Sequence, residues 1–370
     1  MSYCINPRCE ERKNQDHLTI CSACQNSLLI QGKYRLLEPL RELDAQVNTE
    51  VFVVDAAGTS KVLKVLLNRR LLPMFKLEAQ TLERLQHPGV PRVESDGYFT
   101  FELNNGREMH CLVMEKIEGQ NLEQYLEQNG KICQDRAVDW LEQLVEILGM
   151  LHQKELFHRD IKLSNIMLKP DGQLALIDFG TVRQITNTFL AKLSSSSSSR
   201  EVTSIVSPGY SPPEQIKGKG VPQSDFYALG CCFIHLLTGT HPLDFPDDRQ
   251  TGKLIWYQGD PPVATWLADL INDTIAPLPF QRPLNTQEIS ERLKTEKTLP
   301  QLNKALKDSP QRQPSQRKLG LNLTRVLQLL NILLCVALLV VGLLRWHHKL
   351  QYWKPENKSD LMLRAAGNST

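Results

Sequence analysis

The sequence predicts an α+β fold in two lobes, in which a small strand-rich lobe precedes a larger lobe that is mostly helical. Residues 34–65 contain short runs of apolar and β-branched residues that are typical of strands. Residues 98–114 contain two more such runs around an Asn-Gly pair at 105–106, which is a strong hairpin signal. After residue 119 the apolar residues change to a helical spacing. With 370 residues, of which 41% are hydrophobic, the chain can bury the cores of both lobes.

Each lobe contains a helix that the apolar spacing predicts. In the first lobe, residues 73–85 form a helix whose apolar positions are Phe75, Leu77, Leu82 and Leu85. In the second lobe, Asp135 is expected to cap a longer helix, because its carboxylate can accept hydrogen bonds from the free amides of the first turn. The apolar face of that helix consists of Val138, Leu141, Val145, Leu148 and Leu151.

The charge and the cysteine content exclude some classes of protein. A formal net charge of +2 provides no general field that would attract nucleic acid or anionic lipid, so no nucleic acid partner is expected. The nine cysteines are unevenly placed, with four of them in the first 24 residues, which is unlike the disulfide framework of a secreted protein. The N-terminus also lacks the apolar region of a signal peptide.

Residues 1–30 form a small, polar, cysteine-rich segment. Cys4 and Cys9 are separated by four residues, Cys21 and Cys24 by two, and the two pairs by eleven. Thiolates in two such pairs can close a tetrahedral zinc site in a ribbon that has too few apolar residues to fold alone. We therefore predict a zinc-ribbon-like module that binds Zn²⁺. Redox-active thiols and inert reduced cysteines are the alternatives.

The C-terminal part of the chain predicts a linker and a membrane anchor. Residues 298–322 are rich in Pro, Gln, Lys, Arg and Ser, which is typical of a disordered linker. Residues 323–345 include a nineteen-residue apolar run. A helix of that length rises about 28 Å, close to the thickness of the hydrocarbon core of a bilayer. We predict a single transmembrane helix and a short tail over 346–370, with a buried helix of a soluble fold as the alternative.

Residues 158–180 contain the most informative pattern of the chain. Residues 158–165 have the sequence HRDIKLSN, and the sequence DFG follows at 178–180 after a short hairpin-like stretch. Phosphoryl transfer needs a carboxylate that orients a hydroxyl nucleophile, a cation on the phosphates and oxygen ligands for metal ions, and these segments contain all of them. Over residues 34–297 the chain resembles the catalytic domain of bacterial serine/threonine protein kinases of the eukaryotic type.

The resemblance implies the bilobal protein kinase fold and a role for each matched residue. Asp160 matches the aspartate that orients the substrate hydroxyl, and Lys162 matches the lysine that contacts the γ-phosphate. Asn165 and Asp178 match the ligands of Mg²⁺ or Mn²⁺. The cofactor would be ATP. The acceptors would be Ser and Thr hydroxyls of protein substrates, and self-phosphorylation would be a further activity.

A second set of matches would bind the nucleotide. Lys64 matches the strand lysine that holds the α- and β-phosphates, and Glu78 lies on the helix expected to form an ion pair with it. Two solvated surface charges are the alternative. The segment from Met114 to Ile117 resembles the hinge between the lobes, where backbone groups of Glu115 and Ile117 would bind the adenine edge and Met114 would stand behind it.

The loop that should cover the phosphates departs from the family. Counted from Val51, which matches the valine of the glycine-rich pattern, and from Lys64, the three glycines of that pattern fall on Asp44, Gln46 and Thr49. Glycine lets a backbone approach phosphate closely and adopt positive φ. Two hypotheses follow: an active kinase with a different nucleotide lid, and a pseudokinase that acts as a membrane-tethered scaffold binding nucleotide or protein. The intact catalytic set favours the first.

Further matches would have structural or regulatory roles. Residues 207–214 resemble the peptide-docking segment that ends the activation loop, Glu214 would pair with Arg282, and Asp225 would hold the catalytic loop from a buried helix. A serine run at 194–199 favours a flexible tether. Alternatively, Arg159 would bind a phosphate placed on this loop.

The N-terminal cysteines also carry a resemblance. The opening YCINPRC at residues 3–9 resembles the four-cysteine module found ahead of some bacterial serine/threonine kinases. Together with the predicted anchor, this resemblance implies a kinase in membrane-linked signalling. Because the catalytic domain uses ATP, it would lie on the cytoplasmic side of a single-pass membrane protein.

Overall fold

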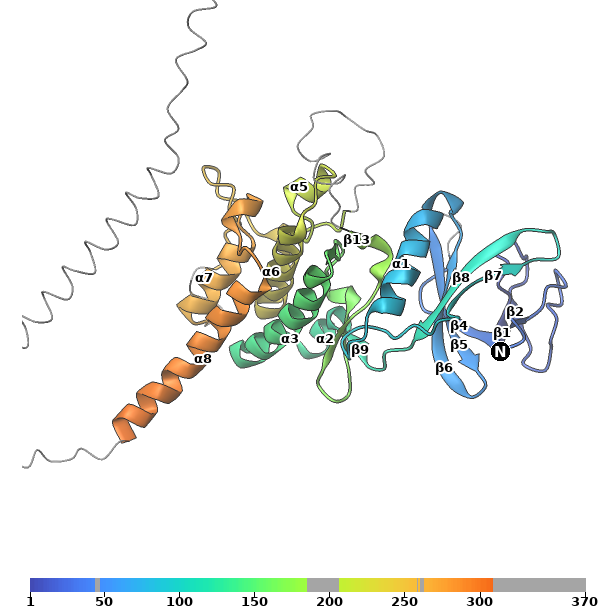
Figure 1. The fold of residues 1–370 in the computed structure, drawn as a ribbon, viewed down its shortest axis with the longest axis horizontal. Helices are drawn as coiled ribbons and strands as arrows, with labels where there is room; N and C mark the ends of the chain where they lie inside the picture. Colours follow the sequence, from blue (N-terminus) through green and yellow to red (C-terminus); the bar gives the residue numbers. More distant parts are fainter. Residues whose placement is uncertain (44–46, 185–205, 258, 260–262, 309–370) are drawn as a thin grey trace, which may run out of the picture. The chain divides into compact units, whose positions relative to one another are not determined.

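The computed structural model describes residues 1–43, 47–184, 206–257, 259 and 263–308, with the side chains of 299–308 left out of the description. Residues Met1–Lys304 form one unit of contacts, so the two lobes and the cysteine segment can be described together. Figure 1 shows this arrangement, with the strand-rich part near the N-terminus and the helices of the second lobe beyond it. The predicted two-lobed α+β architecture is confirmed.

The first lobe is built on a six-stranded antiparallel sheet with the order β3-β4-β5-β6-β8-β7. Its strands are β3 (Leu29–Ile30), β4 (Tyr34–Pro39), β5 (Thr49–Ala56), β6 (Thr59–Leu66), β7 (Tyr98–Glu102) and β8 (Glu108–Glu115). The predicted hairpin joins β7 to β8, and Gly106 takes the positive φ of 77° that its turn requires.

Alternate residues of these strands face two different cores, because successive side chains point to opposite faces of a sheet. On one face, Leu66 and Leu112 pack with the helix α1 (Leu72–Arg84) and continue into the core of the second lobe. On the other face, Phe52 and Val65 pack with Ile5 of the cysteine segment. The sheet is therefore covered on both sides.

The cysteine segment is attached directly to this sheet. It contains the paired strands β1 (Ser2–Tyr3) and β2 (Lys13–Asn14), and its last strand, β3, pairs with β4. Asn104, in the hairpin β7–β8, forms two hydrogen bonds of 2.7 Å with the segment: its backbone N–H donates to Asn26 Oδ1, and its side-chain Nδ2 donates to the backbone oxygen of Gln25. The segment 1–30 is thus part of the first lobe's surface.

The second lobe consists mainly of helices, as predicted. They are α2 (Leu122–Asn129), α3 (Gln134–Gln153), α5 (Pro213–Ile216), α6 (Pro222–Thr238), α7 (Thr265–Thr274) and α8 (Thr286–Asp308). Single 3-10 turns occur at η1 (Arg69–Leu71), η2 (Leu163–Asn165), η3 (Phe179–Thr181), η4 (Pro242–Asp244) and η5 (Pro279–Gln281).

Short strands line the side of this lobe that faces the sheet. Strands β9 (Gln120–Asn121), β11 (Ile166–Leu168) and β12 (Leu174–Leu176) form a small sheet, and β10 (Leu156–Phe157) pairs with β13 (Arg183–Gln184). The residues between β10 and β11, and those between β12 and β13, contain the two motifs singled out from the sequence.

Two details of the helices correct the sequence-based expectations. Asp135 is not the N-cap of α3: Cys133 occupies that position without a side-chain hydrogen bond, and Asp135 lies in the first turn, where its charge suits the helix dipole. The helix α8 continues to Asp308, so the first part of the predicted linker 298–322 is helical. Leu, Gln, Lys and Ala in residues 299–308 are good helix formers, and the composition of 298–322 taken as a whole conceals this local preference.

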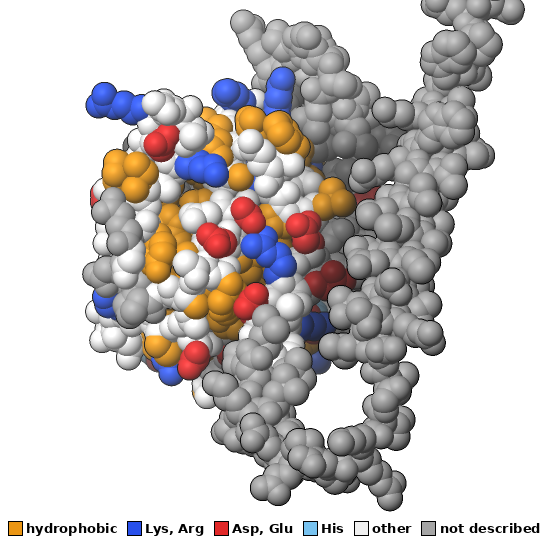
Figure 2. All heavy atoms as spheres, turned by 90° about the vertical axis from the view of Figure 1, so that its left-hand side faces the viewer, with side chains coloured by type: hydrophobic (Ala, Val, Ile, Leu, Met, Phe, Trp, Pro, Cys, Tyr) orange, Lys and Arg blue, Asp and Glu red, His pale blue; other side chains and the backbone are white. Residues whose placement is uncertain are grey.

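Two other expectations concern the surface and the C-terminus. Figure 2 shows apolar side chains interspersed with acidic and basic ones on the visible described face, and the exposed apolar residues of the fold include Leu243, Phe280 and Leu284. Among the helices of the described ranges, none is long and apolar enough to cross a bilayer. The predicted transmembrane segment 323–345 and the tail 346–370 lie outside the described residues.

Candidate active site

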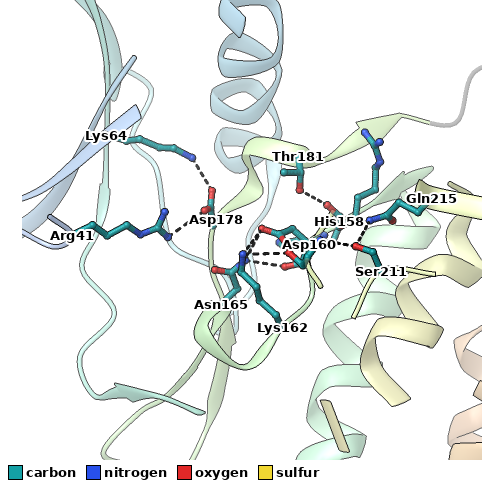
Figure 3. A network of polar contacts seen from close by, with 12 residues as sticks. Arg41, Lys64, His158, Asp160, Lys162, Asn165, Asp178, Thr181, Ser211 and Gln215 are labelled. Carbon is teal, nitrogen blue, oxygen red and sulfur yellow. Dashed lines mark hydrogen bonds and ion pairs between the residues drawn. The ribbon is translucent and has the colours of Figure 1, made fainter. Parts of the chain in front are cut away.

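A cluster of three charges, two of them buried, joins the sheet, α1 and the DFG motif. Lys64 of β6 contacts both carboxylate oxygens of Glu78, at 2.8 and 3.0 Å, and the Oδ1 atom of Asp178, at 2.8 Å. The predicted ion pair between Lys64 and Glu78 is therefore present, and Figure 3 shows Lys64 reaching Asp178 from the first lobe. Both residues of the pair are buried, which excludes the alternative of two solvated charges.

The electrostatics favour the charged forms of Lys64 and Asp178, whereas burial raises the pKa of Glu78. Burial alone would lower the pKa of Lys64, but the carboxylates of Asp178 and Glu78 outweigh it and raise that pKa above its usual value. The charge of Lys64 in turn holds the pKa of Asp178 well below its usual range. Asp178 also has a left-handed backbone with φ of 64°, a conformation that costs a non-glycine residue energy and is common at functional sites.

The HRD motif lies next to this cluster and brings three predicted residues together. Asn165 donates hydrogen bonds from Nδ2 to the backbone oxygen of Asp160, at 2.8 Å, and to its Oδ2 atom, at 3.0 Å. The ammonium group of Lys162 lies 3.1 Å from the same Oδ2 atom. The Asp160 carboxylate is therefore oriented by an amide and beside a cation, as Figure 3 shows.

Asn165 also provides a test of the predicted metal site. Within the described residues its Oδ1 atom is buried and has no hydrogen-bond partner. A buried amide oxygen without a donor is costly unless something else satisfies it, and carboxamide and carboxylate oxygens suit Mg²⁺. The donor set of Asn165 Oδ1 and the Asp178 carboxylate therefore fits a hard divalent cation bound with the phosphates of ATP.

Buried side chains hold the HRD backbone in place. Asp225 of α6 accepts hydrogen bonds from the backbone N–H groups of His158, at 2.9 Å, and Arg159, at 2.8 Å, and from the His152 ring at 3.0 Å. This confirms the expected contact of Asp225 with the catalytic loop. It also explains how Arg159 keeps a positive φ of 72°, because two charge-assisted hydrogen bonds offset the backbone strain.

The predicted buttress of the second lobe is also present. Arg282 is fully buried and makes two parallel contacts with Glu214, at 2.6 Å from Nη1 and 3.1 Å from Nη2. Ser224 donates a further hydrogen bond of 2.7 Å to the same carboxylate. The pair fixes the segment that follows residue 207 to the start of α6.

The nucleotide-binding matches lie on the inner strands β5, β6 and β8 of the sheet and in the residues that follow β8. Val51 is half-buried in β5 and faces Lys64 across the β5–β6 pair. Glu115 ends β8, and its backbone N–H donates to the oxygen of Arg92 at 2.8 Å. Met114 packs against the core that continues into the second lobe, and Ile117 is buried. Of the glycine positions, Asp44 and Gln46 lie outside the described residues, and so does the serine run 194–199.

The sequence did not predict two of the contacts with the aspartates of this site, those of Ser207 and Arg41. Ser207 donates a hydrogen bond of 2.5 Å to Asp160 Oδ1, and Lys162 reaches the same hydroxyl at 3.4 Å. Arg41, from the segment after β4, lies 3.4 Å from Asp178 Oδ2. The motif around Ser207 was recognised, but its spacing carries no information about contact with Asp160.

The four N-terminal cysteines converge on one point. Their Sγ atoms all lie within 4.8 Å of one another, with 3.4 Å between Cys4 and Cys24 and 3.6 Å between Cys9 and Cys21. Zn–S bonds of about 2.3 Å in a tetrahedron place the sulfurs about 3.8 Å apart. The four thiols therefore fit a zinc ion in both number and spacing.

Comparison with known proteins agrees with the fold. A family model described as the protein kinase domain matches residues 56–308. Serine/threonine-protein kinase B of Synechocystis sp. is 33% identical over 271 residues, which cover 69% of this chain and 45% of that protein. Serine/threonine-protein kinase PknA of Nostoc sp. is 36% identical over 224 residues, 59% of this chain and 38% of that protein. The chain thus spans less than half the length of these relatives.

Proposed function

This chain belongs to the protein kinase family, and we propose that it is a serine/threonine protein kinase that transfers the γ-phosphate of ATP to protein hydroxyls. The observation that carries the proposal is the Asp160 carboxylate, which Asn165 orients and which lies within 3.1 Å of the Lys162 ammonium group. Several proteins similar to this chain are named serine/threonine-protein kinases.

In the proposed reaction, Asp160 accepts a hydrogen bond from the acceptor hydroxyl and takes its proton as the oxygen attacks the γ-phosphorus, while the bond from that phosphorus to the β-phosphate oxygen breaks and ADP leaves. Lys162, beside that carboxylate, neutralises charge on the transferred phosphoryl group. Lys64, held by Glu78, binds the phosphates from the first lobe. Bound magnesium would neutralise the phosphates further, and Asn165 and Asp178 are the residues that would hold it.

The test is transfer of labelled phosphate from ATP, with magnesium, to a generic protein substrate and to the chain itself. Asp160→Ala and Asp178→Ala should each lower the rate of phosphate transfer by about 10³-fold or more relative to wild type. Asp171→Ala is the matched control, because Asp171 is an exposed aspartate of the same lobe. Equal signals from all four proteins would overturn the proposal.

The pseudokinase scaffold is the second candidate, because the chain has no glycine between Gly32 and Gly58. A scaffold needs binding without transfer. Measurable ATP binding by the wild-type chain, combined with no phosphate transfer under any metal condition, would favour it. The intact charge cluster of Lys64, Glu78 and Asp178 supports the active kinase instead.

We also propose that Cys4, Cys9, Cys21 and Cys24 bind one zinc ion with a structural role. The spacing of their sulfurs supports this, and so do amide donors near two of them: Asn26 Nδ2 lies 3.1 Å from Cys24 Sγ, and a second asparagine amide lies 3.6 Å from Cys21 Sγ. Metal analysis should find one zinc per chain, retained in Cys133→Ser, whose thiol is exposed elsewhere, and lost in Cys21→Ser. A chain without stoichiometric zinc contradicts this assignment.

The final part of the proposal concerns location. The apolar run within 323–345 supports a single membrane anchor, with the ATP-using domain in the cytoplasm and a role in membrane-linked signalling. The full chain should fractionate with membranes, and a chain shortened to residues 1–322 should not. A full chain that stays in the soluble fraction would rule the anchor out.

A further inference from the structure

The cysteine module, defined as residues 1–30, contacts the kinase sheet through one arginine. Arg12 lies between the second and third cysteines in the sequence. Its backbone oxygen accepts a hydrogen bond of 2.8 Å from the Cys4 N–H, and its Nε donates one of 3.0 Å to the Cys4 oxygen. The neighbouring Glu11 oxygen lies 3.1 Å from Cys9 Sγ. Arg12 is therefore held by the same backbone that holds the thiols.

The guanidinium group of Arg12 leaves the module and binds Glu50 of β5. Its Nη1 and Nη2 atoms lie 2.7 and 2.8 Å from the two carboxylate oxygens of Glu50. The side chains are 12% and 3% exposed, so the pair is almost fully removed from water. The guanidinium also lies 5.5 Å from the centre of the Phe52 ring, a distance at which a cation and an aromatic face attract.

A buried pair of this kind contributes mainly to position. The desolvation of two charges offsets much of their attraction, but a bidentate fork fixes the distance and angle between the two groups. Losing one partner leaves a buried charge without compensation. The Arg12–Glu50 pair therefore fixes the start of β5 relative to the cysteine module.

The start of β5 is also the part of the sheet that borders the nucleotide site. Glu50 and Val51 are consecutive, so their side chains point to opposite faces, and Val51 is paired with Lys64. The Val51 oxygen accepts a hydrogen bond of 2.8 Å from the Leu40 N–H, at the beginning of the segment that carries Arg41. Arg41 in turn reaches Asp178, as Figure 3 shows.

These contacts form a continuous path from the thiols to the phosphate end of the site. The chain has no glycines with which to fold its own backbone around phosphate in this segment. We therefore expect the contact of Arg12 with Glu50, which comes from outside the sheet, to hold the start of β5 in position. Glu50 and Phe52 contact Arg12 of the module, and Val51 lies on the opposite face, the face of its cross-strand partner Lys64, so the strand links the two faces.

We propose that Arg12 is a positioning residue for ATP binding, which ties the cysteine module through Glu50 to the start of β5. The inference rests on the proposed kinase function, and it concerns nucleotide affinity, leaving the chemistry of transfer to Asp160. It adds a role for the module that a zinc site alone does not imply.

The experiment measures the dissociation constant of magnesium ATP, and amide hydrogen exchange at residues 40 and 49–52, in the full chain. Arg12→Ala should weaken ATP binding about tenfold, within the range typical of coupling between sites, and should speed exchange at these amides. The rate at saturating ATP should stay within about twofold of wild type. Arg8→Ala, an exposed arginine of the same module, should match wild type in every measurement.

A variant with both charges removed guards against simple misfolding. Replacing a buried ion pair by apolar residues is often neutral for stability, so the double variant R12M/E50L should remain folded. Its affinity for ATP should remain as low as that of Arg12→Ala. A folded R12M/E50L with wild-type affinity, or a folded Arg12→Ala with wild-type affinity and exchange, would overturn the inference.

Two further comparisons separate the links of the argument. Cys21→Ser should weaken ATP binding as much as Arg12→Ala, and combining the two should add nothing, because both act through one contact. Fully additive losses would contradict the path through Arg12. A wild-type chain that binds no ATP would refute the kinase proposal, and amide exchange in Arg12→Ala would then decide the positioning role alone.

Discussion

Ser207 donates a hydrogen bond to the Asp160 carboxylate from a position 47 residues further along the chain. The hydroxyl also lies within 3.4 Å of Lys162. Ser207 begins the segment 207–214, and the last residue of that segment, Glu214, forms an ion pair with the buried Arg282. The Asp160 carboxylate is thus linked by one side chain to the segment 207–214.

Removing this hydroxyl should impair turnover more than binding. Ser207→Ala leaves Asp160 Oδ1 without its donor, so we expect kcat to fall by about tenfold or more, which corresponds to about 1.4 kcal/mol or more in the barrier, while KM for ATP stays near wild type. Ser207→Thr keeps the hydroxyl and should retain most activity. Steady-state kinetics check this, and equal kcat for Ala, Thr and wild type would show that the contact is incidental.

The ion pair between Lys64 and Glu78 should be essential for phosphate binding. Glu78→Gln keeps the size of the side chain but removes the charge that holds Lys64, so kcat/KM should fall by about 10²-fold, or about 2.8 kcal/mol. Glu83→Gln is the matched control, because Glu83 is an exposed glutamate of the same helix. Wild-type turnover by Glu78→Lys would refute the role of the pair.

The Arg282–Glu214 pair should stabilise the second lobe strongly. Arg282→Ala leaves a partly buried carboxylate without its partner and should lower the free energy of unfolding by about 3–5 kcal/mol. Arg292→Ala breaks an exposed pair with Asp273, whose side chains are 35% and 53% exposed, and should cost about 0–1 kcal/mol. Urea unfolding of the two variants tests the contrast, and similar losses would contradict it.

His235 should make stability depend on pH. Burial, with a smaller effect of His241, lowers the pKa of His235 from 6.5 to about 4, against the pull of Asp244. Between these values the unfolded chain binds more protons than the folded one, so stability falls as pH drops from 6.5 to 4 and this contribution is constant above that window. The neutral ring also pairs with the Tyr210 hydroxyl at 2.7 Å.

The measurement for His235 is the unfolding free energy at pH 7 and at pH 4. Because the ring is only half-buried, we expect it to account for about 1–2 kcal/mol of the difference. His235→Gln should remove that part, whereas His17→Gln, which changes an exposed histidine, should leave the pH dependence as in wild type. An unchanged pH dependence in His235→Gln would contradict the assignment.

The catalytic motifs could be found from the sequence because their residues are close together in it. Asp160, Lys162 and Asn165 lie within one turn-like segment, so their spacing alone brings them together. The pairs of Lys64 with Glu78 and of Glu214 with Arg282 followed from matches to a known family, and the structure has both. The N-cap of α3 was missed because Cys133, a poor capping residue, occupies it, with Asp135 two positions later.

The contacts of Ser207 with Asp160 and of Arg12 with Glu50 could not be found in this way. Each joins residues that are far apart in the chain, and no periodic pattern encodes the pairing. In the sequence, Arg12 is one of several basic residues of a polar segment. Only its burial against Phe52 and Glu50 distinguishes it.

The sequence by itself determined the order of strands and helices, the hairpin at Gly106, the apolar face of α3, and the identity of the residues suited to phosphoryl transfer. These features depend on local spacing and side-chain chemistry. The tertiary structure decided that β3 adds the cysteine module to the sheet and that four thiols meet at one point. It also decided which side chains reach the Asp160 and Asp178 carboxylates. Such contacts depend on how two cores pack against the faces of one sheet, which local spacing does not encode.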